Sequence, residues 1–373
     1  MRLVPVWALR PGMKVARRVS RGNGAPLLNA GVKLEMEYIQ QLKKLNVRAV
    51  YIHDNLIPDI EIEDVILDQT REKAIYLVNN TMNSLKEDDH KKLSSLFLAK
   101  KELSSLLDDI VTQLLSNKNL TVNLSDIRCT DDYTFSHSVN VAVLSIMTGI
   151  SMGISKSELK DIGLGAFLHD LGKVVVPLSI LNKPDRLEED ERLEIERHPV
   201  YGINLVKGRH LFNGPIFSII HKHHERIDGS GYPQGLQGHD LDLYPKVCAV
   251  ADVYDALVSD RPYRQGFKPH EAMEIMDSEC GGYDLQVMQK FYHHLAAYPI
   301  GTIVGLNNGY IGVVVSNTHG YPYLPRVRII CEREYFAPLE SFEIDLLDTM
   351  NVAVDRVYND HELPGDLLNR EPS

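Results

Sequence analysis

Hydrophobic residues recur every three or four positions through the middle of the chain, a spacing typical of amphipathic helices. Between residues 61 and 119, Ile75, Val78, Met82 and Leu85 follow this spacing, and charged residues cover the other faces. Residues 120–298 continue it with longer apolar stretches. The pattern predicts an amphipathic helical linker at 61–119, suited to relaying a signal, to pairing in a dimer or equally to packing on its own domain. It also predicts a large, almost entirely helical domain at 120–298.

Shorter apolar runs precede this helical region. Residues Met13–Val19 alternate like a strand, and Gly22-Asn23-Gly24 is typical of a hairpin connection. Residues Glu35–Leu45 have helical spacing, and Ala49–Ile52 has the character of a short buried strand. Residues 1–58 are therefore predicted to form a small α/β module, regulatory or dimerising, with no residues that suggest chemistry.

Strand-like runs return after the helical region. They are Thr302–Gly305, Tyr310–Val315 and Val327–Cys331, and Asn307-Asn308-Gly309 favours a turn between the first two. We expect a β appendage at 299–358 and a frayed tail at 359–373. The predicted fold is mainly α, with a small α/β module before the helical domain and a small β appendage after it.

Composition and charge narrow the classes of function. The 373 residues are 44% hydrophobic and 24% charged, which is ordinary for a globular protein, and the formal net charge is −11. Non-specific affinity for nucleic acid comes from neutralising phosphates, so an acidic chain is a poor binder of nucleic acid polymers. A local basic pocket for a small anion remains compatible with this charge.

The sequence also predicts a cellular compartment. Its beginning lacks the apolar segment of a signal peptide, and its most apolar stretch, Val139–Ile154, falls short of the roughly 20 residues that a bilayer span requires. Four scattered cysteines, without a CxxC pair, indicate buried thiols of a reducing compartment. These features predict a cytoplasmic protein without a membrane span.

Imidazole and carboxylate side chains are concentrated in the helical domain. This donor set contains no thiolate and suits iron, manganese or another first-row divalent ion better than a structural zinc. The candidate residues are His137, His169, Asp170, His198, His223, His224 and Asp252.

Five of these residues, at three places in the sequence, stand out by their local context. The adjacent pair His169-Asp170 ends the apolar segment Ile162–Leu168, where both side chains can reach one metal at the helix end. The adjacent pair His223-His224 follows the apolar Ile216–Ile220, and adjacent imidazoles are costly to bury without partners. Asp252 lies in an apolar helical segment, where a metal would offset the cost of burying the carboxylate.

The order of these motifs resembles the HD-GYP subfamily of HD-domain phosphohydrolases. The resemblance covers about residues 125 to 300. It is carried by the strings His169-Asp170-Leu171-Gly172-Lys173, His223-His224-Glu225, Asp228-Gly229-Ser230-Gly231-Tyr232-Pro233 and Asp252 with Arg261-Pro262-Tyr263-Arg264. It implies an all-helical HD-type catalytic domain.

The resemblance also implies a role for each matched residue. The seven histidines and aspartates match metal ligands, with Asp170 as the carboxylate shared by two metals and His224 as a ligand in members that hold three. Lys173 matches a residue near the scissile phosphate, so Asp170 and Lys173 are the expected catalytic residues. The residues that match substrate contacts are Lys173, Gly231, Tyr232, Pro233, Arg261 and Arg264.

One departure from the family pattern concerns the number of metals. Members with a third metal carry a glutamate four residues before the first histidine ligand, where this sequence has Tyr133, with Asp132 one place away. A phenol is a poor ligand at neutral pH because its pKa is about 10. We expect two divalent ions, Fe or Mn, and His224 then becomes an unliganded or substrate-contacting residue unless Asp132 compensates.

The expected function is hydrolysis of cyclic di-GMP to linear pGpG, with GMP after further turnover. Two alternatives stay open: a non-catalytic cyclic di-GMP receptor, and an HD hydrolase of a related cyclic dinucleotide such as cyclic GMP-AMP. The sequence contains no HExxH, P-loop or GxGxxG motif, which disfavours a zincin protease, a nucleoside triphosphatase and a dehydrogenase.

The remaining partner predictions are a homodimer and signalling proteins acting through residues 1–58. Glu225 is either a support for an imidazole or a solvated charge.

Overall fold

The computed structural model describes residues 1–20, 26–45, 47, 49–85, 89–117, 121–122, 133–183, 185–207, 212, 214–259, 266–364 and 367. The chain divides into two compact units. One is helical and combines Val65–Leu120 with Thr134–Tyr292. The other combines Met1–Asp64, Thr121–Tyr133 and His293–Ser373, so segments from both ends of the sequence share one unit.

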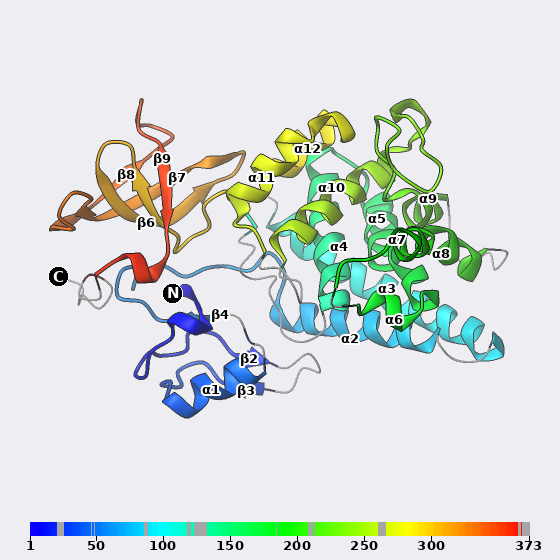
Figure 1. Ribbon diagram of the computed structural model, residues 1–373, viewed down its shortest axis with the longest axis horizontal. Helices are drawn as coiled ribbons and strands as arrows, with labels where there is room; N and C mark the ends of the chain where they lie inside the picture. Colours follow the sequence, from blue (N-terminus) through cyan, green and yellow to red (C-terminus); the bar gives the residue numbers. More distant parts are fainter. Residues whose placement is uncertain are drawn as a thin grey trace. The chain divides into compact units, whose positions relative to one another are not determined.

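The helical unit holds the longest helices of the protein (Figure 1). Its α-helices are α2 (Asp68–Ser84), α3 (Asp89–Ser116), α4 (Tyr133–Ser151), α5 (Lys156–Leu168), α6 (Leu178–Leu181), α7 (Glu189–Glu196), α8 (His198–Val206), α9 (Gly214–Lys222), α10 (Leu243–Val258), α11 (Pro269–Ser278) and α12 (Leu285–Tyr292). Short 3-10 helices are η3 (Leu171–Val175), η4 (Gly238–Asp240) and η5 (Cys280–Gly282).

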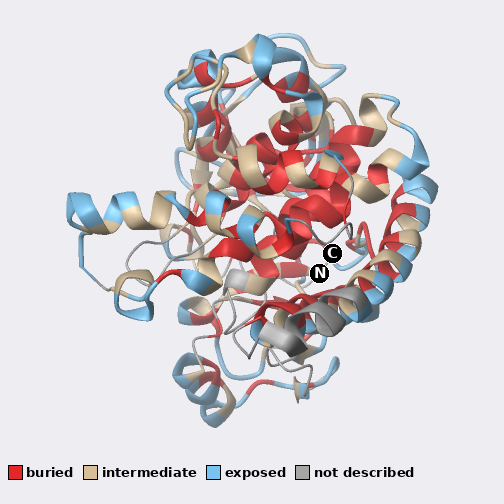
Figure 2. Ribbon diagram, turned by 90° about the vertical axis from the view of Figure 1, so that its right-hand side faces the viewer, coloured by how far each residue is buried: buried red, intermediate tan, exposed pale blue. Residues whose placement is uncertain are grey.

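Helix α5 lies at the centre of this unit and packs against α3, α9 and α10. Figure 2 shows buried positions gathered in these central helices and exposed positions on the outer ones. A capping box between Ser155 and Glu158 sets where α5 begins. At Gly165 a Cβ atom would lie 2.6 Å from Cδ1 of Ile219, so glycine permits the close approach of α9. The glycine therefore allows the C-terminal ends of α5 and α9 to lie side by side.

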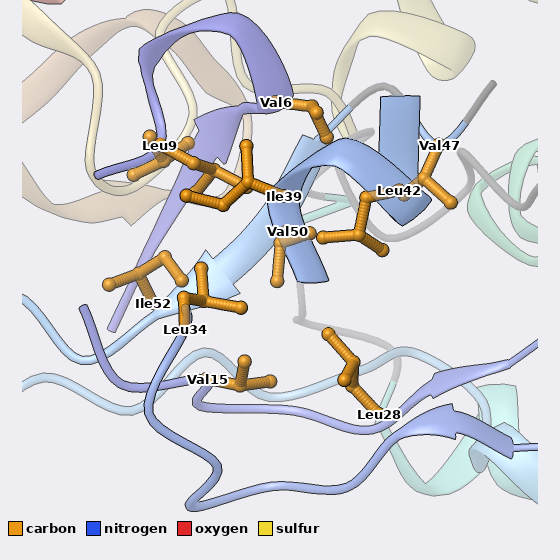
Figure 3. Packing of buried hydrophobic residues seen from close by; sticks show 11 residues of the cluster. Val6, Leu9, Val15, Leu28, Leu34, Ile39, Leu42, Val47, Val50 and Ile52 are labelled. Carbon is orange, nitrogen blue, oxygen red and sulfur yellow. The ribbon is translucent and has the colours of Figure 1, made fainter. Parts of the chain in front are cut away.

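The N-terminal part of the other unit is a small α/β module. Strand β1 (Arg2–Pro5) pairs antiparallel with β4 (Ala49–Ile52), and β2 (Val19–Ser20) pairs with β3 (Pro26–Leu28). Between β1 and β2 lies the 3-10 helix η1 (Val6–Ala8), and α1 (Met36–Lys44) precedes β4. Figure 3 shows how aliphatic side chains from η1, α1 and β4 meet in one apolar core.

The same unit contains a five-stranded antiparallel sheet in the order β8-β7-β6-β5-β9. Its strands are β5 (Ile303–Leu306), β6 (Tyr310–Thr318), β7 (Tyr321–Glu332), β8 (Pro338–Asp345) and β9 (Val354–Tyr358), followed by the 3-10 helix η6 (Asp360–Glu362). Leu56 and Ile57 pack into the apolar core beneath this sheet.

Most predicted elements appear in the structure. The predicted helix Glu35–Leu45 and strand Ala49–Ile52 are α1 and β4, and the three strand runs after the helical region are confirmed as β5, β6 and β7. The strand predicted at Met13–Val19 is wrong, because Lys14 and Val15 form only isolated bridges and β2 begins at Val19. The hairpin connection predicted at Gly22-Asn23-Gly24 lies outside the described residues.

The mainly α fold class is confirmed, with a helical domain followed by a small sheet. The frayed tail expected from residue 359 is wrong for its first residues, which form η6, and Leu363 and Leu367 are buried. Of the described cysteines, Cys248 and Cys331 are buried as expected, whereas Cys280 is exposed. Among the described residues, no helix combines the length and apolar character that a membrane span requires.

Candidate metal centre

The His169-Asp170 pair lies at the point where α5 ends and η3 begins. All residues of α5 from Ile162 to Leu168 are buried, so the helix delivers both side chains into the interior, where His169 is 0% and Asp170 2% exposed. At Gly172 a Cβ would lie 1.8 Å from the carbonyl oxygen of His198. A glycine at this position is therefore required for α8 to approach η3.

Two more histidines face Asp170 from α8 and from the end of α9. Nε2 of His198 lies 3.3 Å, and Nε2 of His223 4.0 Å, from Oδ1 of Asp170. The two Nε2 atoms are 3.1 Å apart. The partly buried His224 completes this side, with Nδ1 3.6 Å from Oδ2 of Asp252.

On the other side of Asp170 lie one histidine from α4 and one aspartate from α10. Nε2 of His137 is 4.0 Å from Oδ2 of Asp170 and 3.0 Å from Oδ1 of Asp252. Nε2 of His169 is 3.9 Å from the same Asp252 oxygen.

The structure thus brings all seven candidate residues together. Their donor atoms form three overlapping groups, each compact enough to hold one metal ion: His137, His169 and Asp170; Asp170, His198, His223 and His224; and His169, His223 and Asp252. Asp170 belongs to the first two groups, through which the carboxylate can serve two ions at once.

Backbone carbonyls set the orientation of three of the imidazole rings. Nδ1 of His169 lies 2.6 Å from the carbonyl oxygen of Ala166, and His198 and His223 make the same kind of contact with Ile195 and Ile219 at 2.8 and 3.0 Å. A ring that donates its Nδ1 proton in this way keeps the lone pair on Nε2. The three Nε2 atoms therefore carry lone pairs that face the interior of the cluster.

A buried carboxylate orients the ring of His137. Oδ2 of Asp255 lies 2.7 Å from Nδ1 of His137, and its Oδ1 accepts a hydrogen bond from Asn140 at 2.9 Å. Asp255 belongs to none of the motifs singled out in the sequence. Its signal is the spacing of three residues from Asp252, which places a second carboxylate on nearly the same face of an apolar helix.

Burial and neighbouring charges favour the protonation states that metal ligands need. Burial lowers the pKa of His198 to about 3 and that of His224 to about 4, and lowers the pKa of His223 well below its usual range. Burial opposes ionisation of Asp170, but the positive charge of the neighbouring Lys173 ammonium opposes this effect, and the pKa of this carboxyl is held well below the usual range.

His137 and Asp252 form a coupled pair at the edge of the cluster. Burial disfavours the charged imidazole, but hydrogen bonds with Asp252 and Asp255 outweigh it and raise the pKa of His137 well above its usual range. The same contact holds the pKa of Asp252 well below its usual range, against the effect of burial. A cation at Nε2 of His137 would displace this proton, so metal binding there releases a proton.

The cluster fits divalent cations because two of its inward atoms lack hydrogen-bond partners among the described residues. Nε2 of His169 and Oδ1 of Asp170 are buried and have no hydrogen-bond partner among the described residues. The Nε2 lone pairs of His198 and His223 face each other at 3.1 Å, an arrangement that a bound cation would stabilise. Unpaired buried polar atoms are costly, and metal coordination would satisfy them.

Lys173 lies at the partly exposed side of the cluster. Its Nζ is 2.7 Å from Oδ2 of Asp170. Tyr232 also borders the cluster, since its ring centroid lies 4.7 Å from that of His224. Burial raises the pKa of the Tyr232 phenol, which therefore stays neutral.

The loop with Gly231, Tyr232 and Pro233 is held in place by Glu225. The two carboxylate oxygens of this buried residue accept hydrogen bonds from the backbone N–H groups of Gln234 and Leu236 at 2.7 and 2.9 Å. Both interpretations of Glu225 from the sequence are therefore wrong, because its partners are main-chain groups of this loop.

Some predicted residues cannot be placed. Arg261, Arg264 and Asp132 lie outside the described residues. Tyr133 begins α4, but its side chain is also outside the described part. Their roles remain predictions.

A helical domain with a buried cluster of imidazoles and carboxylates from several of its helices defines the class: a helical protein with a candidate metal centre. Comparison with known protein families identifies the helical domain more closely. Residues 109–287 match the family model described as "HD domain", and residues 303–365 match "KOW domain associated with HD domain". The helical domain of this chain is an HD domain, and the predicted resemblance to the HD-GYP subfamily is confirmed.

Three curated relatives are similar to this region. The cyclic di-GMP phosphodiesterase PA4108 of Pseudomonas aeruginosa is 36% identical over 244 residues, which are 65% of this chain and 59% of the relative. The 3'3'-cGAMP-specific phosphodiesterase 1 of Vibrio cholerae is 37% identical over 193 residues, which are 50% of this chain and 43% of the relative. The cyclic di-GMP phosphodiesterase response regulator RpfG of Xanthomonas campestris is 41% identical over 133 residues, which are 35% of each chain. The chain thus spans less than two thirds of each of these relatives.

Proposed function

We propose that this protein is a metal-dependent phosphodiesterase that hydrolyses cyclic di-GMP to linear pGpG. The observation that carries the proposal is the position of Asp170, which belongs to two groups of potential metal ligands and whose buried Oδ1 has no hydrogen-bond partner among the described residues. The names of two of the similar proteins support the substrate.

The ligand atoms suggest how two cations would be held. His137, His169 and Asp252 would hold one, His198 and His223 the other, and Asp170 would serve both. Imidazole and carboxylate donors without a thiolate favour Fe or Mn. When bound, such cations supply the positive charge and Lewis acidity that activate water and neutralise a phosphodiester.

The protein's own residues complete the site. The ammonium of Lys173 is partly exposed beside Asp170, where it would donate to a phosphate oxygen and stabilise the negative charge that develops during hydrolysis. Tyr232 covers His224 and would form one wall for the substrate, with Gly231 and Pro233 beside it. Arg261 and Arg264 would contact the substrate phosphates, for which the arginine fork is suited.

A second candidate substrate is the hybrid dinucleotide cyclic GMP-AMP. The observation that favours it is the similarity to a Vibrio cholerae enzyme named as specific for this compound. Both substrates present the same phosphodiester to Asp170 and Lys173, so the chemistry of the site is equal for the two, and discrimination depends on contacts with the bases.

The decisive experiment uses the full chain, purified anaerobically and loaded with Fe(II) or Mn(II). Each dinucleotide is offered at equal concentration, and products are resolved by chromatography. We expect pGpG from cyclic di-GMP and two metals per chain by mass spectrometry. Faster turnover of the hybrid would assign the second substrate, binding without turnover would assign a receptor, and three metals per chain, lost in Asp132→Ala, would show that Asp132 compensates for Tyr133. GMP formation, the cytoplasmic location, a homodimer and signalling partners of residues 1–58 stay predictions.

A further inference from the structure

A recess of about 320 Å³ lies in the unit that contains the N-terminal module and the five-stranded sheet. Residues from η1, from the segment after β4 and from η6 line it, including Arg2, Trp7, Arg10, Asp54, Asp360 and His361. In Figure 1, η6 lies beside η1, so residues from both ends of the sequence form the recess. The volume is at the lower end of the range for small-molecule sites, about 300 to 1,000 Å³.

A buried charge cluster lines one side of the recess. Nε of Arg2 donates to Asp54 at 2.7 Å, and its Nη1 donates to Asp360 at 2.6 Å. The Arg2 side chain is 5% exposed, so the cluster is fixed in position. Oδ1 of Asp54 also accepts from the backbone N–H of Leu56 at 2.8 Å. Acceptor lone pairs of both carboxylates stay unused, because each carboxylate has about four lone-pair sites.

An exposed aromatic side chain lies at the mouth of the recess. Val6 and Leu9, on either side of Trp7 in the sequence, enter the apolar core of the module, as Figure 3 shows. Trp7 is instead 52% exposed and meets the ring of His361 in a T-shaped contact at 5.3 Å. An indole beside an imidazole, half open to solvent, is suited to stacking on a planar ring.

A cation without a partner completes the lining. Arg10 is exposed, and its guanidinium has no ion pair among the described residues, whereas Arg2 in the same recess has two. A guanidinium fork matches the geometry of a phosphate, which it binds through two parallel hydrogen bonds.

We propose that this recess binds a purine nucleoside monophosphate or a planar anion of similar size. The base would stack on Trp7, its N–H groups would donate to the carboxylates of Asp54 and Asp360, and the phosphate would contact Arg10. Binding would link η1 to η6, because the ligand contacts residues of both. The proposal concerns only residues outside the metal centre and does not depend on the activity proposed above.

Tryptophan fluorescence tests this proposal directly, because Trp7 is the only tryptophan in the chain. GMP is titrated into the full-length protein in the presence of a chelator, so that the metal centre contributes no affinity. We expect a saturable change in the emission of Trp7, with guanosine and ribose 5-phosphate each binding more weakly than GMP. Arg10→Gln should weaken GMP binding about tenfold or more, since a charge-assisted hydrogen bond contributes about 1.5–3 kcal/mol.

The matched control is Lys14→Gln, which removes one exposed positive charge from the same module outside the recess. This variant should bind GMP like the unmodified protein. Calorimetry on Trp7→Leu, with the melting temperature as a check of folding, should show weakened binding when the ring is lost. The proposal is overturned if GMP changes neither the emission nor the heat signal, or if Arg10→Gln and Lys14→Gln bind GMP equally.

Discussion

The carboxylate of Asp255 lies 2.7 Å from Nδ1 of His137, and both side chains are buried. Asn140 donates to the other carboxylate oxygen, so the carboxylate is held from a second side. This contact requires Nδ1 of His137 to carry the proton and leaves Nε2 for the metal centre. Asp255 is therefore a positioning residue: it determines which nitrogen of His137 is available as a ligand.

Replacement of Asp255 by Asn should weaken metal binding about 10- to 100-fold. An amide can donate to Nδ1 and would then stabilise the wrong tautomer, with the proton on Nε2. The measurement is a metal titration of chelated protein, and Asp185→Asn, an exposed aspartate of the same unit, is the control. If both variants bind metal equally well, the ring of His137 needs no support from Asp255.

Asp170→Ala should abolish hydrolysis and greatly reduce bound metal, because two groups of ligands share this carboxylate. The helical fold should persist, which circular dichroism would show. Chelation provides a second measurement: a metal at 100 times its Kd stabilises a protein by about 2.7 kcal/mol, so a chelator should lower the Tm of the unmodified protein. The Tm of Asp170→Ala should not respond to the chelator. Normal activity with normal metal content in this variant would contradict a shared ligand.

The double substitution Arg261→Ala with Arg264→Ala should raise KM far more than it changes metal content. This prediction comes from the resemblance in sequence and from the need of a substrate with two phosphates for fixed cations in an acidic protein. Steady-state kinetics and metal analysis on the same preparation separate the two effects. An unchanged KM would remove both arginines from the substrate site.

The site residues that could be predicted from their local sequence share one property: the residues next to them in the chain indicate that they are buried. His169-Asp170 and His223-His224 follow apolar helices, so their burial and its cost can be inferred from neighbours along the chain. His137 and His198 have no such context, and only the resemblance to a family assigned them. Strand β8 was missed for a related reason, since most of its residues are exposed and its sequence shows no clear alternation.

Hydrogen bonds between a side chain and distant main-chain groups cannot be predicted from the pattern of residue types. Glu225 binds the N–H groups of residues nine and eleven positions later, and no side-chain pattern reports such a partner. The 3-10 helix η6 combines a local and a distant contact. Glu362 accepts from the backbone N–H of Asn359 at 2.6 Å, and Asp360 pairs with Arg2 across almost the whole length of the chain. The distant ion pair, like the contacts of Glu225, follows from tertiary structure.

Glu225→Gln should raise KM about tenfold and leave metal content unchanged. Glutamine can accept only one of the two loop N–H groups, and its own NH₂ group would face the other, so one buried donor loses its partner. Such a loss costs about 1–3 kcal/mol, which corresponds to roughly 5- to 150-fold if it acts on the loop that is proposed to contact substrate. Glu189→Gln, on the exposed start of α7, is the control. A fall in bound metal in Glu225→Gln would instead place its effect on the ligands.

Gly231→Ala should reduce activity and destabilise the helical unit by about 1–3 kcal/mol. A Cβ at this position would lie 2.3 Å from the backbone nitrogen of Arg226, 2.5 Å from the carbonyl oxygen of His224 and 2.6 Å from Cα of Glu225. These atoms belong to the backbone that carries His224, so the loop would have to move away from the metal centre. At Gly281 a Cβ would meet nothing within 4 Å, which makes Gly281→Ala the matched control. Thermal unfolding and kinetics of both variants check the prediction, and equal behaviour of the two would show that the loop tolerates the added methyl group.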